Sequence, residues 1–434
     1  MPLLPTRSAI RYLLAVALSS SLSACAEQPA SKATSAPQQQ PLAANQPTTA
    51  APNVLVSTQP AQSFSAWLSE LRSEALSLGI NAKLLDQAFA GLRPDPSVLK
   101  ADQSQPEFTR PAWAYIESAT SEVRIRKGQA MLREHAATLA AIEQRYGVSP
   151  TILVAIWGME SSFGQFMGEQ SVIRSLATLA YEGRRQQFAR EQLLAALAIL
   201  QNGDISIQRM RGSWAGAMGQ TQFIPTTYNS HAVDFDGDGR RDIWDSSADA
   251  LASAAHYLQA SGWQHGQTWG FEVQLPKNFD FALADTDLRR SLSDWKKIGV
   301  RAAALSAQPA DAQASLLLPA GHRGPAFLVM NNFRVILRYN NSTAYALAIG
   351  LLSERLQNRG QLQASWPKGE VPLSRSQKIA LQEGLSAKGY TPGVADGIIG
   401  ANTRKAVRAY QQSLGWPADG YPTTELLQQL NGKP

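Results

Sequence analysis

One long apolar segment, residues 150–164, constrains the fold more than any other feature of the chain. It reads Pro-Thr-Ile-Leu-Val-Ala-Ile-Trp-Gly-Met-Glu-Ser-Ser-Phe-Gly. Pro150 suits the first turn of a helix, and Gly164 can end one. Because most side chains between them are apolar, the predicted helix must be buried nearly all round. Other helices must therefore pack around it, which indicates a mainly helical core.

The single acid of this segment, Glu160, stands at the far end of the predicted helix. Burial there removes water from the carboxyl group and raises its pKa. A glutamic acid that stays protonated near neutral pH is what a general acid for a glycosidic oxygen requires. A glutamate at a helix end can also reach into solvent, and this segment alone does not separate the two cases.

A second segment, residues 212–225, combines glycine, amide and aromatic side chains. Its glycines allow close approach of the backbone to a neighbour. Gln220 and Gln222 offer amide donors and acceptors, and Trp214 and Phe223 offer faces for stacking. The segment suits the wall of a sugar-binding cleft, although such a stretch can equally be a packing loop.

The chain divides into five regions by composition. Residues 1–24 read as a signal peptide. Residues 25–61, rich in Pro, Gln, Ala, Ser and Thr, cannot bury enough apolar surface to fold, and we expect a tether. Residues 62–365 hold the helical and strand patterns, residues 366–372 form a short linker, and residues 373–434 form a separate small module.

The N-terminus has the charge and hydropathy pattern of a lipoprotein signal. Arg7 and Arg11 precede a short apolar run, and small residues lead to Cys25, the only cysteine. The apolar run is too short for a spanning helix. The ending Leu-Ser-Ala-Cys resembles a lipobox, which implies cleavage before Cys25 and its lipidation, and the non-acidic Ala26 implies sorting to the outer membrane. The alternative is a free thiol inside an ordinary signal peptide, since one cysteine excludes an intrachain disulfide.

Hydrophobic periodicity predicts helices through most of residues 64–260 and again over 344–355. Between these stretches, short apolar or alternating runs are punctuated by glycine and proline. Residues 271–275, 327–330 and 333–339 therefore read as strands of a small sheet. The predicted fold class is α+β and mainly α, with a small inserted sheet and a C-terminal three-helix module.

The charge of the chain is mildly basic. The net charge is +6, from 40 basic and 34 acidic residues, and no long run of Lys or Arg occurs. The pattern does not indicate a nucleic-acid partner. A mildly basic protein suits an acidic polymer through long-range attraction.

The two motifs together resemble the lytic transglycosylase B family, whose catalytic core is lysozyme-like. Glu160-Ser-Ser-Phe-Gly is similar to the catalytic turn of that family, and Gly-Ala-Met-Gly-Gln-Thr-Gln-Phe-Ile-Pro, ending at Pro225, is similar to its downstream wall. The resemblance covers roughly residues 64–365. It implies that the substrate is bound by Arg184, Arg185, Ser213, Gln222, Phe223, Tyr257, Tyr339, Asn340 and Tyr345.

The resemblance implies a mechanism with one carboxyl group, whereas most glycosidases use two. Glu160 would protonate the oxygen that bridges MurNAc and GlcNAc in peptidoglycan, and an oxocarbenium-like state would form. The same carboxylate would then accept the proton of the MurNAc 6-hydroxyl, which closes onto C1 as a 1,6-anhydro end. Ser213 is a candidate for positioning the N-acetyl group, and Gln222 for orienting Glu160 or the sugar. No cofactor is expected for this chemistry.

A run of acids after residue 233 is spaced like the ligands of an EF-hand loop, with a glycine at the sharp turn. The candidate ligands are Asp234, Asp236, Asp238, the carbonyl of Arg240, Asp242 and Asp245. Because the last position holds Asp rather than Glu, its reach is shorter, and Asp249 competes for this role. We expect a structural Ca²⁺, with Na⁺ as an alternative. An acidic turn with an Asp helix cap also fits the pattern.

The C-terminal module has a dense pattern of its own, with a turn at Asp396-Gly397 and an amphipathic helix over 403–414. It resembles the three-helix peptidoglycan-binding domain found appended to wall hydrolases, and an unrelated small helical bundle is the alternative. The resemblance implies peptidoglycan glycan strands as the partner, and the sequence indicates no protein partner.

The combined expectation is a periplasmic lipoprotein held by Cys25 in the inner face of the outer membrane. Two other functions stay open at this point. One is a wall-binding lipoprotein that has lost catalysis, against which the intact Glu160 argues. The other is a lysozyme-type hydrolase that delivers water to C1.

Overall fold

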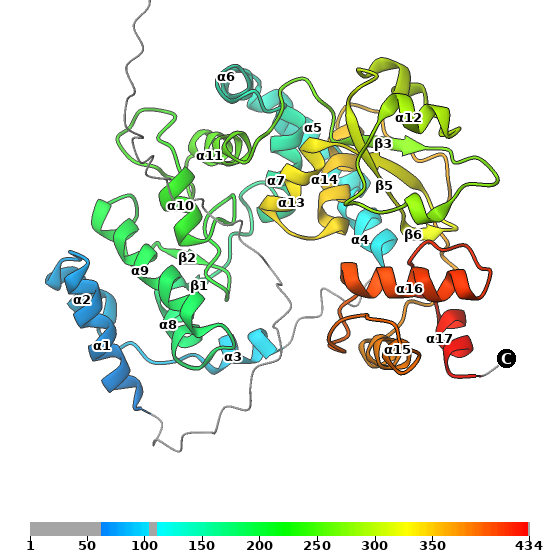
Figure 1. Cartoon of the computed structure of the whole chain (residues 1–434). Helices are drawn as coiled ribbons and strands as arrows, with labels where there is room; N and C mark the ends of the chain where they lie inside the picture. The colour runs from blue at the N-terminus through cyan, green and yellow to red at the C-terminus, as the bar shows by residue number, and fades with distance from the viewer. Residues whose placement is uncertain (1–61, 104–110, 433–434) are drawn as a thin grey trace, which may run out of the picture. The chain divides into compact units, whose positions relative to one another are not determined.

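The structure is a computed structural model that describes residues 62–103 and 111–432. The predictions for the signal peptide, Cys25 and the tether fall outside these residues. Helices dominate the described part, as expected, and the strands are short (Figure 1). No helix within the described ranges is long and apolar enough to cross a membrane.

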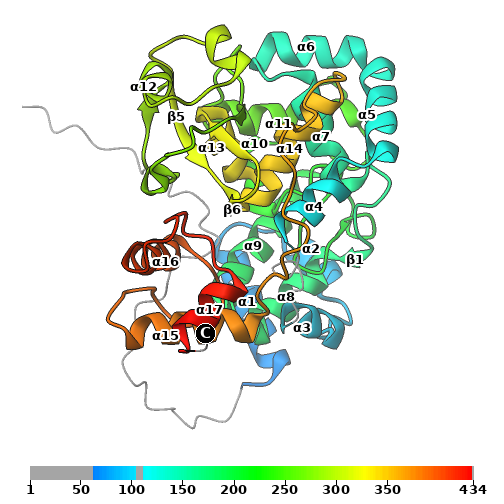
Figure 2. The same cartoon turned by 90° about the vertical axis from the view of Figure 1, so that its right-hand side faces the viewer.

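The helical part of the fold is built around α7 (Pro150–Ser161). Pro150 occupies the first turn, and all residues from Ile152 to Gly158 are buried, as the apolar sequence predicts. The helices α5, α6, α11 and α14 all contact α7 (Figures 1 and 2). The other helices of this part are α1 (Phe64–Ser77), α2 (Ala82–Phe89), α3 (Pro96–Gln103), α4 (Ala112–Ala119), α5 (Glu122–Glu134), α6 (Ala136–Tyr146), α8 (Val172–Glu182), α9 (Gln186–Asn202), α10 (Pro225–His231), α11 (Ser247–Ala260), α13 (Asn331–Tyr339) and α14 (Thr343–Arg355).

A small antiparallel sheet with its own core follows α11 in the chain (Figure 1). Its strand order is β3-β7-β5-β4, so the predicted strands over 271–275 and 327–330 are neighbours. The fully buried Trp295 anchors this core, and its indole nitrogen donates to the Ala314 carbonyl at 3.1 Å. The elements of this part are β3 (Gly270–Val273), the 3-10 helix η2 (Phe281–Leu283), β4 (Arg290–Ser291), α12 (Leu292–Lys297), the 3-10 helix η3 (Ala303–Ala307), β5 (Gln313–Leu317), β6 (Pro319–His322) and β7 (Ala326–Val329). A separate two-stranded pair joins β1 (Gln170–Ser171) to β2 (Arg211–Gly212).

The prediction of a strand over residues 333–339 is wrong, because this segment forms helix α13. Its sequence alternates apolar and polar side chains, but Phe333 and Ile336 also recur at helical spacing and are both buried. Asn332 anchors the first turn of α13, since its amide nitrogen donates to the carbonyls of Gln264 and Gln267 at 2.9 and 2.7 Å. Tertiary packing therefore overrides the local preference of a short β-branched run.

The C-terminal module consists of α15 (Arg375–Ala387), α16 (Ala401–Ser413) and α17 (Thr424–Leu430). Leu381, Val407 and Leu426 are fully buried in a core separate from the other two. The predicted turn at Asp396-Gly397 is held from inside, because Gln382 accepts from the Gly397 backbone N–H at 2.8 Å. Three helices around one core agree with the predicted architecture of this module.

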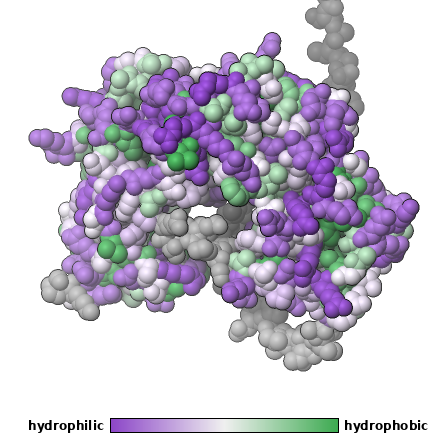
Figure 3. Space-filling model, turned by 180° about the vertical axis from the view of Figure 1, so that it is seen from behind, coloured by the Kyte–Doolittle hydropathy of each residue, from purple (hydrophilic) through white to green (hydrophobic). Residues whose placement is uncertain are grey.

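The surface is mainly hydrophilic on the face seen in Figure 3, with small scattered hydrophobic patches. Few large apolar side chains are well exposed in the described ranges. The most exposed include Val371 and Phe166, at 77% and 72%. Phe166 directly follows the turn that ends α7, so an apolar ring lies free close in sequence to the candidate acid.

Candidate active site

The turn after α7 fixes the position of Glu160. Ser162 and Phe163 both have positive φ, 51° and 65°, so the chain reverses sharply just past the acid. The hydroxyl of Ser161 donates to the Gln220 carbonyl at 2.8 Å and accepts from the Gly164 N–H at 2.9 Å. A left-handed backbone at two successive non-glycine residues is costly and persists only where the surroundings enforce it. The Glu-Ser-Ser-Phe-Gly motif is therefore a rigid support for the carboxyl group.

Glu160 itself is half-buried and its carboxyl group is desolvated. Burial raises the pKa of Glu160 to about 7, and a hydrogen bond from Tyr345 opposes this rise. The Tyr345 hydroxyl donates to Oε1 of Glu160 at 2.5 Å. No second carboxylate among the described residues contributes to this pKa. The group can therefore give up or take a proton near neutral pH.

Two phenols accompany the acid, the buried Tyr345 and the half-buried Tyr339. Tyr345 lies in the first turn of α14 and Tyr339 ends α13. Burial raises the pKa of both phenols well above its usual value, and the charge of Glu160 adds to the rise. Both hydroxyls therefore stay protonated and donate: Tyr345 to Glu160, and Tyr339 to the Thr221 carbonyl at 2.8 Å.

An aromatic cluster lies behind Tyr339. The ring centres of Phe223 and Tyr257 lie 5.8 and 5.4 Å from that of Tyr339, the second pair at nearly a right angle. The hydroxyl of Tyr257 donates to the Arg338 carbonyl at 2.7 Å. Phe223 and Tyr257 are only 3% and 8% exposed, so they act mainly by holding Tyr339 in place.

The two glutamines of the glycine-rich wall, which the sequence did not distinguish, have different surroundings in the structure. Gln220 is buried: its Oε1 accepts from the Trp157 indole nitrogen at 2.9 Å, and its Nε2 donates to the Trp244 carbonyl at 3.0 Å. Gln222 is half-buried with a positive φ of 50°, and its Nε2 donates to two backbone carbonyls at 3.0 Å. Gln220 therefore joins the wall to α7, whereas the side chain of Gln222 stays partly exposed.

The remaining predicted substrate residues are spread more widely. Ser213 is half-buried, and its hydroxyl accepts from the Ala217 N–H at 3.0 Å. Arg184 pairs with Asp102 at 3.0 Å, and the Arg185 guanidinium lies 4.1 Å from the centre of the Phe188 ring. Asn340 is exposed just after α13. The structure brings Glu160, Tyr339 and Tyr345 into one group, and among the described residues no hydrogen bond, ion pair or ring contact joins the side chain of Arg184, Arg185 or Asn340 to it.

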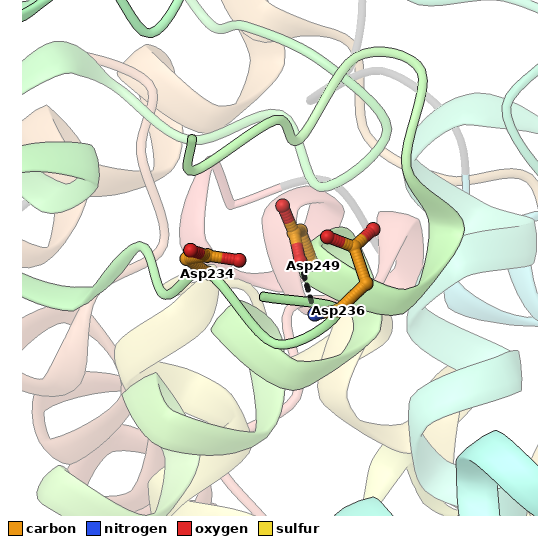
Figure 4. Close-up of side chains that lie close together, drawn as sticks. All are labelled: Asp234, Asp236 and Asp249. Atoms are coloured by element: carbon orange, nitrogen blue, oxygen red, sulfur yellow. Dashed lines mark hydrogen bonds between the residues drawn. The ribbon is translucent and has the colours of Figure 1, made fainter. Parts of the chain in front are cut away.

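The acidic loop brings three carboxylates together (Figure 4). An oxygen from each of Asp234, Asp236 and Asp249 lies within 4.8 Å of the others. Oxygens bound to one Ca²⁺ at about 2.4 Å can be up to roughly 4.8 Å apart, so this donor set fits the ion. Burial raises the pKa of Asp249, and the charge of Asp236 adds to the rise. A bound cation would offset that repulsion.

The other predicted ligands have different contacts in this structure. Asp245 forms an ion pair with Arg209, and Asp238 forms one with Arg240. Asp242 is 3% exposed and accepts from the backbone N–H of Trp244 and that of Asp245, both at 2.9 Å. Of the two residues that compete to close the loop, Asp249 is the one beside Asp234 and Asp236.

Two contributors to the site were not assigned their role from the sequence. The hydrogen bond from Tyr345 to Glu160 joins two helices that lie far apart in the sequence, and no local sequence pattern predicts it. The structural role of Gln220 depends on Trp157 and Trp244, again from other segments. One feature of the sequence could have indicated this role of Gln220, namely the glycines around it. A side chain among closely packed backbone must satisfy its polar atoms within the protein.

The class of protein follows from this arrangement. A lysozyme-like helical core whose central helix carries one desolvated acid near its end, with phenol donors and a glycine-rich wall, is the arrangement expected of a glycan-cleaving enzyme. Residues 63–354 match the Transglycosylase SLT domain family, and residues 374–430 match the Putative peptidoglycan binding domain family. The chain belongs to the SLT transglycosylase family, in the lytic transglycosylase B group, and is a lytic transglycosylase of peptidoglycan.

Characterised relatives agree with this assignment. Membrane-bound lytic murein transglycosylase B of Escherichia coli (strain K12) is 31% identical over 296 residues, covering 66% of this chain and 76% of that protein. The crystal structure of SltB3 from Pseudomonas aeruginosa in complex with NAG-anhNAM-pentapeptide is 59% identical, with a TM-score of 0.82, over 85% of this chain and 100% of that one. The Escherichia coli lytic transglycosylase Slt35 in complex with calcium is 29% identical, with a TM-score of 0.58, over 67% and 92% of the two chains.

Proposed function

We propose that Glu160 is the only acid/base of this enzyme and that the products end in 1,6-anhydro-MurNAc. The observation that carries the proposal is the desolvated carboxyl group with a pKa of about 7, to which no second carboxylate of the described residues contributes. A glycosidase with two carboxyl groups would place the second within about 10 Å, across the bond to be cleaved.

The first step is a proton transfer that breaks the glycosidic bond. Protonated Glu160 gives its proton to the oxygen between MurNAc C1 and GlcNAc, the bond from C1 to that oxygen breaks, and GlcNAc leaves with a new hydroxyl. The positive charge that develops at C1 is shared with the ring oxygen, and the N-acetyl group of the same MurNAc can stabilise it. Burial of Glu160 prepares this step, because the raised pKa keeps the carboxyl group protonated near neutral pH until it meets the glycosidic oxygen.

The second step closes the ring. Glu160, now a carboxylate, takes the proton of the MurNAc 6-hydroxyl while O6 bonds to C1, so that atoms and charge balance. The hydrogen bond from Tyr345 stabilises the carboxylate between the steps. Because the 6-hydroxyl belongs to the same sugar, its effective concentration exceeds that of water that reaches the site.

We propose the substrate contacts from the place of each residue relative to Glu160. Ser213 and Gln222, both half-buried in the glycine-rich wall, are proposed to contact the N-acetyl group and the sugar next to Glu160. Tyr339 and Tyr345 form the floor, and Phe223 and Tyr257 support it. Arg184 and Arg185 are proposed to contact more distant parts of the strand, where exposed charges suit the acidic peptide stems, and the exposed Asn340, which directly follows Tyr339, is proposed to contact the strand next to the floor.

A structural Ca²⁺ is proposed for the acidic loop, with Na⁺ as the alternative ion. Asp234, Asp236 and Asp249 would hold it, and a relative of known structure was determined in complex with calcium. The ion would offset part of the negative charge of the three carboxylates and so stiffen the loop between α10 and α11. It has no part in the proton transfers.

We also propose that Cys25 carries lipid and holds the enzyme at the inner face of the outer membrane, in the periplasm. The sequence ending Leu-Ser-Ala-Cys supports this location, and one relative is described as membrane-bound. Replacing Cys25 with Ala should move the protein from the membrane fraction to the soluble fraction after lysis. Unchanged membrane association would contradict the anchor while leaving the chemistry untouched.

The mass of the products tests the proposed reaction. Digestion of purified sacculi should give fragments lighter by one water than hydrolytic ends, because no water adds across the bond. Fragments at the hydrolytic mass would show a lysozyme-type hydrolase. The absence of any fragment would show a wall-binding protein without catalysis.

A further inference from the structure

A cavity lies at the opposite end of α7 from Glu160. Its volume is about 590 Å³, and the first turn of α7, the loop after α11, β3 and the end of α14 line it. Thr151, which lines the cavity, and Glu160 are roughly 14 Å apart along the helix axis. No residue that we assign to the acid or its sugar-binding wall belongs to the lining. The cavity is therefore distinct from the candidate active site.

The cavity lies where the helical part meets the small sheet, a common place for ligands. Its lining includes the partly exposed Trp263 and the amide side chains of Gln267, Gln308 and Gln361. Two buried polar atoms of the wall, Oε1 of Gln267 and the indole nitrogen of Trp269, lack a hydrogen-bond partner among the described residues. Unpaired polar atoms beside a cavity are costly, and a ligand hydroxyl or an ordered water can satisfy them after a small side-chain movement.

The charged groups of the lining are mostly used within the protein. Glu354 pairs with Arg359 at 3.0 Å. Both carboxylate oxygens of Glu272 accept backbone N–H groups, those of Gln363 and Ala364, at 2.8 Å. Beside Arg359 the lining carries three carboxylates, those of Glu143, Glu272 and Glu354, which disfavour an anionic ligand, and its aromatic face and amides suit a neutral ligand with hydroxyl and amide groups.

A second cavity of about 700 Å³ adjoins the first and shares Glu272, Ala304 and Gln361 with it. The two cavities together, called the β3 recess below, run beside the edge strand β3 of the small sheet. Two adjoining cavities of these volumes match an oligomer better than a single small molecule. The second cavity also holds Lys296 and Arg301, whose positive charge suits an acidic substituent on such a chain.

We propose that the β3 recess is a second saccharide-binding site, which takes an N-acetylated amino-sugar segment of peptidoglycan while Glu160 acts on a different segment. The proposal rests on the proposed function, since a glycan-cleaving enzyme meets this polymer at high local concentration. Trp263 provides the stacking face, and the glutamine amides match the N-acetyl and hydroxyl groups. A second attachment within the same domain would keep the enzyme on the wall between cuts.

The test uses the full chain with Glu160→Gln, so that the sugar is not consumed, and chitotetraose as the neutral amino-sugar probe. Hydrogen–deuterium exchange should slow in residues 263–272, which line the recess, and in residues 213–223, which line the candidate active site. Adding Ala307→Trp, which fills the recess from an exposed position, should abolish the slowing in 263–272 and leave that in 213–223.

Two further variants separate binding from folding. Trp263→Ala should weaken the protection of residues 263–272 by about tenfold or more in sugar concentration. Gln264→Ala, an exposed neighbour outside the lining, should leave it unchanged. Equal melting temperatures for Ala307→Trp and its parent would show that the filled recess leaves the fold intact.

The inference is overturned if 213–223 is protected while 263–272 is not. It is also overturned if Ala307→Trp and Trp263→Ala leave the protection of 263–272 unchanged, or if only a stem peptide and not the sugar protects that segment. None of these outcomes affects the proposed function, which is judged from the anhydro products of the unaltered enzyme.

Discussion

The hydroxyl of Tyr345 donates a hydrogen bond to Oε1 of Glu160 at 2.5 Å. Tyr345 lies in the first turn of α14, which runs antiparallel to α7. The other ends of the two helices are also joined, since Gln357, just after α14, donates to the Thr151 hydroxyl at 3.2 Å. The pair α7 and α14 therefore forms a rigid frame with the acid at one end and the β3 recess at the other. The balance between burial and this phenol sets the pKa of Glu160 near 7.

Removing the phenol should shift the pH profile to higher values. The Tyr345 hydrogen bond favours the carboxylate, so Tyr345→Phe should raise the pKa of Glu160 above about 7 and move the alkaline limb of kcat/KM upward. The rate at the optimum should fall by about tenfold or more, because the carboxylate between the steps loses its donor. Tyr146→Phe is the matched control, since that buried hydroxyl has no partner among the described residues. An alkaline limb that stays in place would contradict the role of the phenol.

Glu160 should lower the stability of the fold as pH rises. Its folded pKa of about 7 lies above the ordinary 4.5, so the folded state binds the proton more tightly than the unfolded state. Stability is unaffected by this group below about pH 4.5, falls through the interval up to pH 7, and is then lower by roughly 3 kcal/mol. Glu160→Gln should therefore gain stability over the unaltered enzyme as pH increases, measured by urea unfolding at pH 4.5 and 8. The exposed Glu182→Gln is the matched control for the substitution itself.

The two glutamines of the wall should respond differently to substitution. Gln220→Leu leaves the Trp157 indole N–H and the Trp244 carbonyl unpaired in the interior, so it should cost about 2–4 kcal/mol in urea unfolding. Gln222→Ala should cost less than about 1 kcal/mol while lowering activity, because water can take the place of the half-buried amide and reach the half-buried Met167. Equal losses of stability would contradict the structural role assigned to Gln220.

The calcium proposal predicts a metal-dependent melting temperature. Ca²⁺ at about 100 times its Kd should stabilise the folded chain by about 2.7 kcal/mol, and a chelator should remove the effect. Asp249→Asn should abolish the Ca²⁺-dependent rise, whereas Asp245→Asn should keep it, because Asp245 pairs with Arg209 instead. The reverse pattern would show that the loop closes at Asp245.

The sequence predicted those parts of the fold whose burial leaves a strong local signal. The helix over 150–161 was predicted with its bounds, because proline, an apolar run and a glycine mark its start, body and end. The prediction of a strand over 333–339 was wrong, because these seven residues fit both the alternating spacing of a strand and the spacing of a helix. The hydrogen bonds of Asn332 to carbonyls far away in the sequence stabilise the helix.

The candidate site shows the same division. The position of Glu160 near the end of a buried helix could be predicted from the sequence, whereas its desolvation needed the structure, because a glutamate at a helix end can also reach into solvent. The hydrogen bond from Tyr345 to Glu160 depends on how the helices pack, and so does the approach of Asp249 to Asp234 and Asp236. No local sequence pattern predicts either of them.

The rate of Glu160→Gln on purified sacculi tests the central claim most directly, because one carboxyl group is proposed to perform both proton transfers. The account predicts a loss of at least about a thousandfold in cleavage, while sedimentation with sacculi, which reports wall binding, stays unchanged. The exposed Glu182→Gln should cleave at the normal rate. Cleavage by Glu160→Gln within a few fold of the unaltered enzyme would contradict the assignment of Glu160 as the acid.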